Sequence, residues 1–355
     1  MKQQRPHIPD AEARAFEGFL REAGQIGIVS HTRPDGDAVG SCLALKHFIE
    51  ALPGAAPRCR ILLDTEVPDA VRFLFSPDDE RQTLVFRQDG GEAAAYAAGC
   101  DLLCFLDLNR FSRAGGLEDV LRGSGARKIL IDHHLDPDRS QFGLCFSDTG
   151  VSSTCELLYL LLSRCPSVTE QGLPAPCLDP LLTGITTDTN NFANSVSGTT
   201  LSVVSALLEA GADRETILEH IYNEYPERRI RLMGYLLDRE LILTESGAAL
   251  MVLDGETARA FGIREGETEG FVNLPLAIDR VKMSLFLRQD GGEYRVSIRS
   301  KRGWSANRLA RDCFDGGGHE QAAGGKILLG GDLRTKADVT ARVLRCTERF
   351  LSDEA

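Results

Sequence analysis

The sequence predicts an α/β protein of two domains: a mostly parallel sheet flanked by helices, followed by a smaller α/β domain. Three observations carry this prediction. From residue 1 to about residue 200, apolar runs alternate with helical segments, which is typical of a parallel sheet covered on both faces. From about residue 245 the chain instead shows alternating runs around a turn. Finally, 355 residues are long for one domain and comfortable for two.

Four strands and three helices are predicted in the first domain. Residues 25–30, "QIGIVS", form an apolar run, and a helical pattern follows from Ala38 to Leu52. Ligands of parallel sheets bind beyond the carboxyl ends of the strands, so the residues after each run are candidate site residues. The other predicted strands are 59–63, 101–108 and 127–134, and the other predicted helices are 152–165 and 201–212.

The domain boundaries follow from a change of pattern. Residues 214–243 have the pattern of one helical stretch, which Pro226 interrupts. We expect an active site in the cleft between the two domains that this stretch joins. The expected domains are 1–213 for the catalytic domain, 214–243 for the helical linker and 244–355 for the substrate-binding domain.

The second domain shows a hairpin signal. Residues 282–300 contain two alternating runs around Asp290-Gly291-Gly292, which predicts two antiparallel strands and a tight turn. A further strand is predicted at 248–253, and helices are predicted at 305–313 and 333–351. This mixture of strands and helices predicts a small α/β domain.

Composition and charge narrow the function classes. The net charge of −12 argues against a broad basic face that coats long nucleic acids, but it is compatible with a small phosphorylated ligand held by local arginines or metal ions. No run of about 18 apolar residues predicts a membrane span, and residues 1–16 lack the apolar core of a signal peptide. The ten cysteines form no C-x-x-C pair, which favours free thiols in a reducing, cytoplasmic location.

Acidic and imidazole side chains gather in four segments, three of which directly follow predicted strands. If these segments share one edge of the sheet, their carboxylates would repel one another unless divalent cations lie between them. Imidazole and carboxylate ligands without thiolate suit Mn²⁺ better than a structural Zn²⁺, and there are enough ligands for two ions. The residues are His31, Asp35 and Asp37 in "HTRPDGDAVGS", Asp107 in "CFLDLNR", Asp132, His133 and His134 in "LIDHH", and Asp188 in "TGITTDTNNF".

Each segment taken alone has a simpler interpretation. Asp35 and Asp37 could cap and begin the helix that starts near Ala38. Asp107 could cap a loop, and Asp188 alone would more often be a turn residue. The joint pattern is more specific, because four of the seven histidines fall inside these few motifs and the "GGGH" motif described below.

The four segments, in this order, resemble the four motifs of the DHH phosphoesterases. "VSIRS" followed by "GGGHEQAAGG" is similar to the associated C-terminal domain of that family, so the likeness spans nearly the whole chain. The two-domain layout most resembles the bacterial nano-RNase/pAp phosphatases, which degrade very short RNAs and dephosphorylate 3′-phosphoadenosine 5′-phosphate (pAp). Asn190 and Asn191 stand where many relatives have glycine and an aromatic residue.

The resemblance implies a role for each motif residue. It implies two divalent metal ions, with Mn²⁺ favoured, and a catalytic group made of His134, Asp107 and Asp132. His134 is expected beside the scissile phosphate, and Asp132 is expected to orient the histidines. In this assignment, one ion is held by His31 and Asp35, the other by Asp37, His133 and Asp188, and Asp107 bridges the two.

Substrate contacts are expected in both domains. Arg113, six residues after Asp107, is a candidate phosphate clamp, although a lone arginine can equally be a surface residue. In "DGGGH", Gly317 and Gly318 let a backbone come close to a ligand, but an ordinary glycine-rich turn has the same sequence. The resemblance implies that this domain grips the substrate through His319 and Arg299, while the basic cluster 299–302 could otherwise be a solvated hairpin end.

The expected function is metal-dependent hydrolysis of very short oligonucleotides to mononucleotides, and of pAp to AMP. The alternative within the family is hydrolysis of cyclic di-AMP or of its linear dinucleotide product. A binding protein with a decayed site is opposed by the complete set of ligands. The expected partners are short RNA or DNA oligonucleotides or small nucleotides and not a membrane, and homodimer formation is left open.

Overall fold

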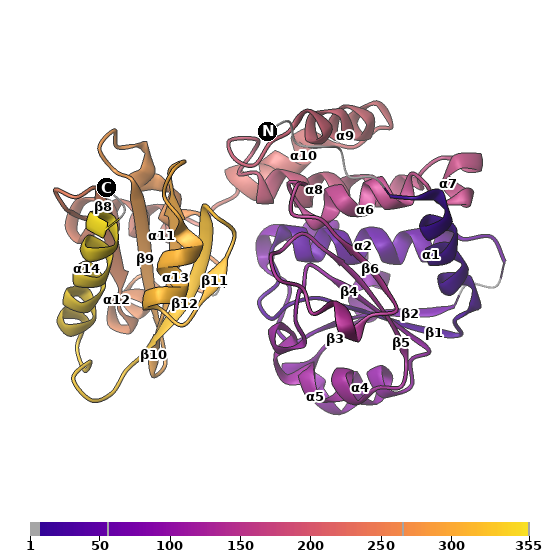
Figure 1. Cartoon of the computed structure of the whole chain (residues 1–355), viewed down its shortest axis with the longest axis horizontal. Coiled ribbons are helices and arrows are strands. Elements are labelled where there is room, and N and C mark those ends of the chain that lie inside the picture. The colour runs from indigo at the N-terminus through magenta and orange to yellow at the C-terminus, as the bar shows by residue number, and fades with distance from the viewer. Residues whose placement is uncertain (1–7, 55–56, 265, 354–355) are drawn as a thin grey trace. The chain divides into compact units, whose positions relative to one another are not determined.

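The first six strands form one parallel sheet. In a computed structural model, which describes residues 8–54, 57–264 and 266–353, the chain divides between Glu224 and Tyr225 into two units (Figure 1). In the first unit each neighbouring pair of strands is parallel, in the order β3-β2-β1-β4-β5-β6. The strands are β1 Gln25–Val29, β2 Arg58–Leu63, β3 Thr83–Val85, β4 Leu102–Leu106, β5 Arg127–Asp132 and β6 Leu144–Ser147.

The predicted fold class is confirmed for this unit. The four predicted strands are present as β1, β2, β4 and β5. The sequence pattern does not predict β3 and β6, because runs of three and four residues are too short to show a period. These two strands are the edges of the sheet, so their absence from the prediction does not alter its centre.

Helices cover both faces of this sheet. They are α1 Asp10–Glu22, α2 Gly36–Ala51, α3 Pro77–Arg81, α4 Phe86–Ala98, α5 Glu118–Gly123, α6 Thr154–Leu162, α7 Pro166–Gln171, α8 Leu178–Asp188, α9 Gly198–Glu209 and α10 Arg214–Leu218. The 3₁₀- or π-helical segments are η1 Asp69–Leu74, η2 Phe111–Leu117, η3 Arg139–Gln141, η4 Ala175–Cys177 and η5 Glu219–Asn223. Successive strand residues point to opposite faces. Ile28 and Leu106 therefore pack with residues of α1, α2, α6 and α8, whereas Val29 and Phe105 pack with residues of α4 and α5. Figure 1 shows these two groups of helices on opposite faces of the sheet.

The strand order reverses direction between β1 and β4. The chain runs outward from β1 through β2 to β3, and then returns to add β4, β5 and β6 on the other side of β1. In open α/β sheets, the crevice at the carboxyl ends of two such strands is the usual ligand site. The predicted site residues after β1 and β4 therefore come together at the point where the topology favours a site.

The second unit contains a mixed sheet in the order β11-β12-β10-β9-β8-β7. Its strands are β7 Ile242–Leu243, β8 Ala248–Leu253, β9 Met283–Asp290, β10 Glu293–Ser300, β11 Gly317–Gly318 and β12 Ala322–Leu328, and its helices are α11 Glu227–Tyr235, α12 Gly255–Ala260, α13 Ala306–Cys313 and α14 Lys336–Asp353, with η6 Leu236–Glu240 and η7 Phe271–Ala277. The predicted hairpin is confirmed as β9 and β10. Asp290 pairs with Glu293, so Gly291 and Gly292 form the turn, and Gly291 has the positive φ of 57° that glycine tolerates.

The segment 214–243 is shared between two cores. Ile217 and Ile221 of α10 and η5 pack into the core of the first unit. Leu232 and Leu236 of α11 and η6 pack with Phe271 in the second. The predicted helical stretch is confirmed up to Glu240 as two helical parts, and Pro226 is the N-cap at the start of the second part, α11. The last residues of the stretch, Ile242–Leu243, are instead a strand that pairs with β8. Within the described parts of the chain, every helix is too short or too polar to cross a membrane.

Candidate metal centre

The start of α2 presents two carboxylates in different ways. Asp35 is the N-cap of α2, and its Oδ1 accepts hydrogen bonds of 3.0 Å from the backbone N–H groups of Asp37 and Ala38. Asp37 lies in the first helical turn and is only 1% exposed. Its carboxylate accepts the backbone N–H groups of Thr154 and Cys155, at 2.7 and 2.9 Å, at the start of α6. The capping interpretation therefore describes Asp35 but does not explain the burial of Asp37.

A first cluster forms where β1 meets β4. His31 Nε2 lies 3.1 Å from Asp107 Oδ2 and 4.0 Å from Asp35 Oδ1. His31 Nδ1 lies 2.9 Å from the carbonyl oxygen of Thr32, which can only accept. Both ring nitrogens thus face acceptors, and although burial and Arg113 act to lower the pKa of His31, its bond to Asp107 raises that pKa overall. With a cation between the ring and the two carboxylates, the proton of the neutral ring would belong on Nδ1 and Nε2 would be free to act as a ligand.

A second cluster surrounds His133. Its Nε2 lies 3.8 Å from Asp37 Oδ2, 3.5 Å from Asp107 Oδ1 and 3.4 Å from Asp188 Oδ2. These separations are longer than good hydrogen bonds. The separations of 3.5 and 3.4 Å match instead the spacing of about 3–3.5 Å between ligand atoms that share one ion at bonds of about 2.0–2.2 Å, and the 3.8 Å separation from Asp37 is slightly longer. The three carboxylates therefore surround the imidazole nitrogen as the ligands of a cation would.

Asp107 belongs to both clusters. Its Oδ2 faces His31 and its Oδ1 faces His133, while Thr154 Oγ1 donates a 3.0 Å hydrogen bond to Oδ1. The residue has a positive φ of 57°, an uncommon conformation for a residue other than glycine, and it is 2% exposed. Such strain clusters at functional sites and persists only when the surroundings hold it in place. The backbone after β4 thus turns this carboxylate between the two histidines.

Asp188 reaches the centre from a helix and not from a strand. It is the last residue of α8, which packs on α2 and α6. The carboxyl end of a helix carries partial negative charge, so an aspartate there is unfavourable unless a positive group is nearby. The expectation that all four segments share the sheet edge is therefore corrected for this one: three follow strands, and the fourth is the end of a helix.

The pKa values of Asp37, Asp107 and His133 reflect burial and the close approach of several charged groups. Burial, together with the charges of Asp107 and Asp35, raises the pKa of Asp37 well above its ordinary value. Burial also acts to raise the pKa of Asp107, but the histidines around it outweigh burial and hold that pKa well below its ordinary value. Burial and then the charge of His134 lower the pKa of His133 to about 4, so this imidazole is neutral at pH 7. A bound cation would let Asp37 ionise beside the Asp107 carboxylate.

His134 is held from both sides. Its Nδ1 lies 2.8 Å from Asp132 Oδ1, and its backbone N–H donates to Asp132 Oδ2 at 3.0 Å. Its Nε2 lies 3.1 Å from Arg113 Nη1. Because a guanidinium only donates, His134 accepts at Nε2 and carries its proton on Nδ1. The structure therefore brings Arg113 into the centre and places Asp132 directly behind His134.

Sequence reasoning missed three supporting residues. Thr154 and Cys155 hold Asp37 and Asp107, as described above, and no spacing rule connects them to the acidic motifs. Asp64 directly follows β2, so the rule that found Asp107 could have found it. Its Oδ2 accepts from Thr32 Oγ1 at 2.5 Å and its Oδ1 from the Gly116 N–H at 2.9 Å. Asp64 thereby ties the loop after β1 to η2, which carries Arg113.

The donor set fits divalent cations of the Mn²⁺ type. The two clusters offer buried or half-buried imidazole nitrogens and carboxylate oxygens whose atoms lie within 4.8 Å of one another, and neither includes a thiolate. The residues that could hold ions are His31, Asp35 and Asp107 in one cluster and Asp37, His133 and Asp188 in the other, with Asp107 facing both.

The predicted substrate residues of the second unit lie around the β11–β12 hairpin and on β10. Arg299 is in β10, next to β12, and its Nη1 donates to the carbonyl oxygen of Ile298 at 3.0 Å. Gly317 and Gly318 form β11, and the His319 N–H donates to the carbonyl oxygen of Ala322 at 2.7 Å, which closes the turn into β12.

The glycine run also serves packing. A Cβ on Gly316 would lie 1.9 Å from the carbonyl oxygen of Gly324, and one on Gly318 would lie 2.6 Å from that of Ala322. These positions therefore require glycine for close strand approach even before a ligand is considered. The backbone packing accounts for Gly316 and Gly318 but not for Gly317, where a Cβ would lie 3.6 Å from Asn307 Oδ1.

Two family models match the chain. The N-terminal domain model of the DHH family matches residues 25–185, and the DHHA1 domain model matches residues 249–344. The first range contains β1 to β6, α2 and nearly all of α8, and thus five of the six predicted metal ligands. Asp188, the sixth, lies three residues beyond it, at the end of α8.

Relatives match over most of their length. A bifunctional oligoribonuclease and PAP phosphatase, NrnA, of Thermus thermophilus is 32% identical over 86% of this chain and 84% of its own length. The protein of the same name from Bacillus subtilis is 28% identical over 84% of this chain and 87% of its own length. A cyclic-di-AMP phosphodiesterase, PdeA, of Listeria monocytogenes is 24% identical, over 57% of this chain and 30% of its own length.

A solved structure extends the likeness to the whole fold. The crystal structure of an exopolyphosphatase-related protein from Bacteroides fragilis superposes with a TM-score of 0.86 and 32% identity. The match covers 98% of this chain and 100% of that chain. The α/β architecture of both units is therefore one that a related chain also adopts.

Proposed function

The chain belongs to the DHH family, and on this premise we propose that it is a phosphoesterase that hydrolyses very short oligonucleotides to mononucleotides and pAp to AMP. The relatives that match over most of the chain are named for these two activities. The observation that carries the proposal is the pair of acid–imidazole clusters that share Asp107.

We propose two divalent ions, with Mn²⁺ preferred, as cofactors. His31 and Asp35 are assigned to one ion, Asp37, His133 and Asp188 to the other, and Asp107 to both. When bound, such ions make water nucleophilic near neutral pH and neutralise charge on a phosphoryl oxygen. The low pKa of His133 supports this assignment, because its imidazole has no proton to lose before it binds a cation.

The protein's own contribution is to position the phosphate and to manage the proton of the leaving group. Arg113 Nη1, which donates to His134 Nε2 here, is directed at the same space and can donate to a phosphate oxygen instead. Asp132 fixes the orientation of the His134 ring. Protonated His134 can then stabilise developing charge or give a proton to the leaving oxygen.

The second unit is proposed to bind the substrate through Arg299, Gly317, Gly318 and His319. Arg299 can contact a phosphate, and a ligand that reaches the β11–β12 hairpin meets backbone there that carries no Cβ at two successive positions.

We also propose a cytoplasmic location, homodimer formation and the boundaries 1–213, 214–243 and 244–355 for the catalytic domain, linker and substrate-binding domain.

The alternative is hydrolysis of cyclic di-AMP or its linear product. It has the support of one relative, PdeA, but that match covers only 30% of the relative's length. The two functions differ in the substrate and not in the metal centre, so only a comparison of substrates separates them.

Turnover on three substrates tests the proposal. RNA of two to five residues, pAp and cyclic di-AMP are each incubated with Mn²⁺, Mg²⁺ or a chelator. We expect Mn²⁺-stimulated release of mononucleotides from the short RNA and of phosphate from pAp. A clear preference for cyclic di-AMP would establish the alternative, and activity that survives exhaustive chelation would exclude the metal-dependent mechanism.

A further inference from the structure

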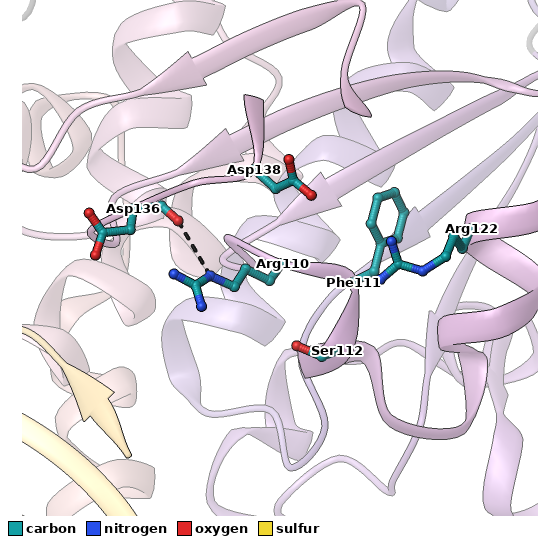
Figure 2. Close-up of a pocket in the computed structure, with 6 residues that line it drawn as sticks. All are labelled: Arg110, Phe111, Ser112, Arg122, Asp136 and Asp138. Carbon is teal, nitrogen blue, oxygen red and sulfur yellow. Dashed lines mark hydrogen bonds between the residues drawn. The ribbon is translucent and has the colours of Figure 1, made fainter. Parts of the chain in front are cut away.

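A pocket of about 420 Å³ opens on the first unit between the loops that follow β4 and β5 (Figure 2). This volume lies within the range of about 300–1,000 Å³ for small-ligand sites. None of its lining residues belongs to the metal clusters described above. They are Arg110, Phe111, Ser112, Arg122, Asp136 and Asp138.

The pocket adjoins the metal centre along both loops. Arg110 is three residues after Asp107, and Asp136 is two residues after His134. Two hydrogen bonds tie these loops together: Asn109 Nδ2 donates to the Leu135 carbonyl oxygen at 2.7 Å, and the Asp138 N–H donates to the Asn109 carbonyl oxygen at 3.0 Å. A ligand that extends from His134 along these loops therefore enters the pocket.

One wall of the pocket is a fixed planar cation. The guanidinium carbon of Arg122 lies 5.0 Å from the centroid of the Phe111 ring, and Arg122 Nη2 lies 2.7 Å from Glu118 Oε1. Phe111 is buried, whereas 49% of the Arg122 side chain is exposed. The aromatic ring and the carboxylate therefore hold the guanidinium while part of it remains open to a ligand. Exposed guanidinium planes are surfaces on which unstacked bases pack.

The opposite side of the pocket offers both donors and acceptors. Arg110 Nε makes a long contact of 3.5 Å to the carbonyl oxygen of Asp136, and Arg110 has no ion pair within residues 8–54, 57–264 and 266–353. Asp138 Oδ1 accepts from Ser140 Oγ at 2.8 Å, and further lone pairs of its carboxylate can accept from a ligand. In Figure 2, Arg110 and Asp136 lie on one side and the Phe111–Arg122 pair on the other.

This mixture of charges favours a base over a phosphate. A second phosphate would meet two carboxylates, whereas a nucleobase presents donors and acceptors together. Guanine offers the acceptors O6 and N7 to an arginine and an amino group to an acceptor such as a carboxylate, whereas uracil has no amino group. We propose that this pocket binds the base of the nucleotide next to the scissile phosphate and prefers guanine to uracil. This inference rests on the proposed function, which supplies the short RNA substrate.

The test compares the linear dinucleotides pGpG and pUpU with the wild-type protein and two variants, Arg110→Ala and Asp138→Asn. The wild type is expected to prefer pGpG in kcat/KM. Each variant is expected to reduce that preference about tenfold, mainly through KM on pGpG. The matched control is Arg139→Ala, an exposed arginine outside the pocket on the adjacent turn, which is expected to keep the preference.

A preference that is unchanged in both variants, with thermal unfolding like that of the wild type, would overturn the inference. Equilibrium binding of GMP and UMP to the Asp107→Asn protein provides a readout that does not depend on turnover. Weaker GMP binding after adding Asp138→Asn supports the pocket even if no dinucleotide is hydrolysed. Equal binding of GMP with and without that substitution excludes the pocket, whereas failure of turnover alone counts against the proposed function.

Discussion

Two clusters of acidic and imidazole groups lie at opposite ends of α2, and only one resembles a metal centre. Near the end of the helix, His47 and Glu50 lie with Asp79, and Lys46 Nζ lies 2.7 Å from Glu50 Oε1 and 2.8 Å from Asp79 Oδ1. At the start of the helix, Asp37 and its neighbour Asp107 have no Lys or Arg ion pair among the residues that the structure describes. The same ligand types therefore occur with and without a built-in cation.

The pKa directions separate the two clusters. Burial acts to raise the pKa of Asp79, but its bonds to His47 and Lys46 outweigh burial, so the pKa of this carboxyl falls well below its ordinary value. For Asp37, burial and neighbouring acids raise the pKa instead. A cluster of acids and histidines thus indicates a metal only where the chain itself does not neutralise the carboxylates. Four variants can break or sharpen this comparison.

The largest effect is expected from Asp107→Asn. Both clusters share this carboxylate, so its loss should reduce Mn²⁺-dependent turnover by on the order of a thousandfold or more. The fold should be retained, because the substitution keeps the size and shape of the side chain. Turnover of pAp and thermal unfolding are measured on the same sample. An Asp107→Asn protein with nearly normal kcat would show that the bridge is not needed.

Asp79→Asn should instead reduce the stability of the protein and leave its turnover nearly unchanged. Lys46 is 1% exposed and keeps only Glu50 as its partner after the substitution, and loss of the charge-assisted bond to Asp79 costs about 1.5–3 kcal/mol of unfolding free energy. Urea unfolding measures this loss, and kcat below the unfolding temperature should stay close to that of the wild type. Loss of Mn²⁺ dependence without loss of stability would instead make this cluster the metal site.

Thr154→Val tests the support of the shared carboxylate. Thr154 Oγ1 donates to Asp107 Oδ1 in a buried site, and loss of such a partner of a metal ligand costs about 10–100-fold in metal affinity or activity. The Mn²⁺ concentration for half-maximal activity should rise, whereas Thr154→Ser should restore it. An unchanged Mn²⁺ requirement in Thr154→Val would show that the hydroxyl does not support Asp107.

The smallest expected effect is a pH dependence of the unfolding free energy that arises from the cluster of His47, Glu50 and Asp79. His47 Nδ1 lies 2.9 Å from the Pro176 carbonyl oxygen and Nε2 lies 3.0 Å from Asp79 Oδ1, so both nitrogens face acceptors and both bonds need the charged ring. Burial acts to lower the pKa of His47, but these bonds raise it overall above 6.5.

A raised pKa in the folded state means that the stabilisation is complete below the unfolded pKa of about 6.5 and is lost as pH rises through the folded pKa. The wild type should therefore lose some unfolding free energy between about pH 6 and about pH 9, and His47→Gln should lose less. Urea midpoints across this range provide the measurement. Parallel curves for the two proteins would assign the pH dependence to groups other than His47.

The sequence predicted the central strands of the first unit and most of the candidate metal ligands that follow them. Apolar runs predicted β1, β2, β4 and β5, and the acids that follow three of them come together, because carboxyl ends of parallel strands share one edge. The edge strands β3 and β6 were too short to give a pattern. The role of Thr154 could not be predicted, because it depends on how α6 packs against α2.

Other features depend on contacts that a linear pattern does not contain. Asp188 resembled a turn residue, whereas it ends α8, and only the packing of α8 on α2 brings it to His133. The cluster of Lys46 and Asp79 joins residues 33 positions apart through a buried lysine, which no sequence motif indicated. The glycine run at 316–318 has the same sequence whether it serves strand packing, a ligand or both.

The most direct test of the account is the calorimetric titration of Mn²⁺ into the chelator-treated wild type, Asp37→Asn and Glu50→Gln proteins. We predict two ions per chain for the wild type and for Glu50→Gln, and at most one tightly bound ion for Asp37→Asn. Loss of an ion from Glu50→Gln, or an unchanged titration of Asp37→Asn, would contradict the claim that the metals bind where no lysine or arginine forms an ion pair with the carboxylates.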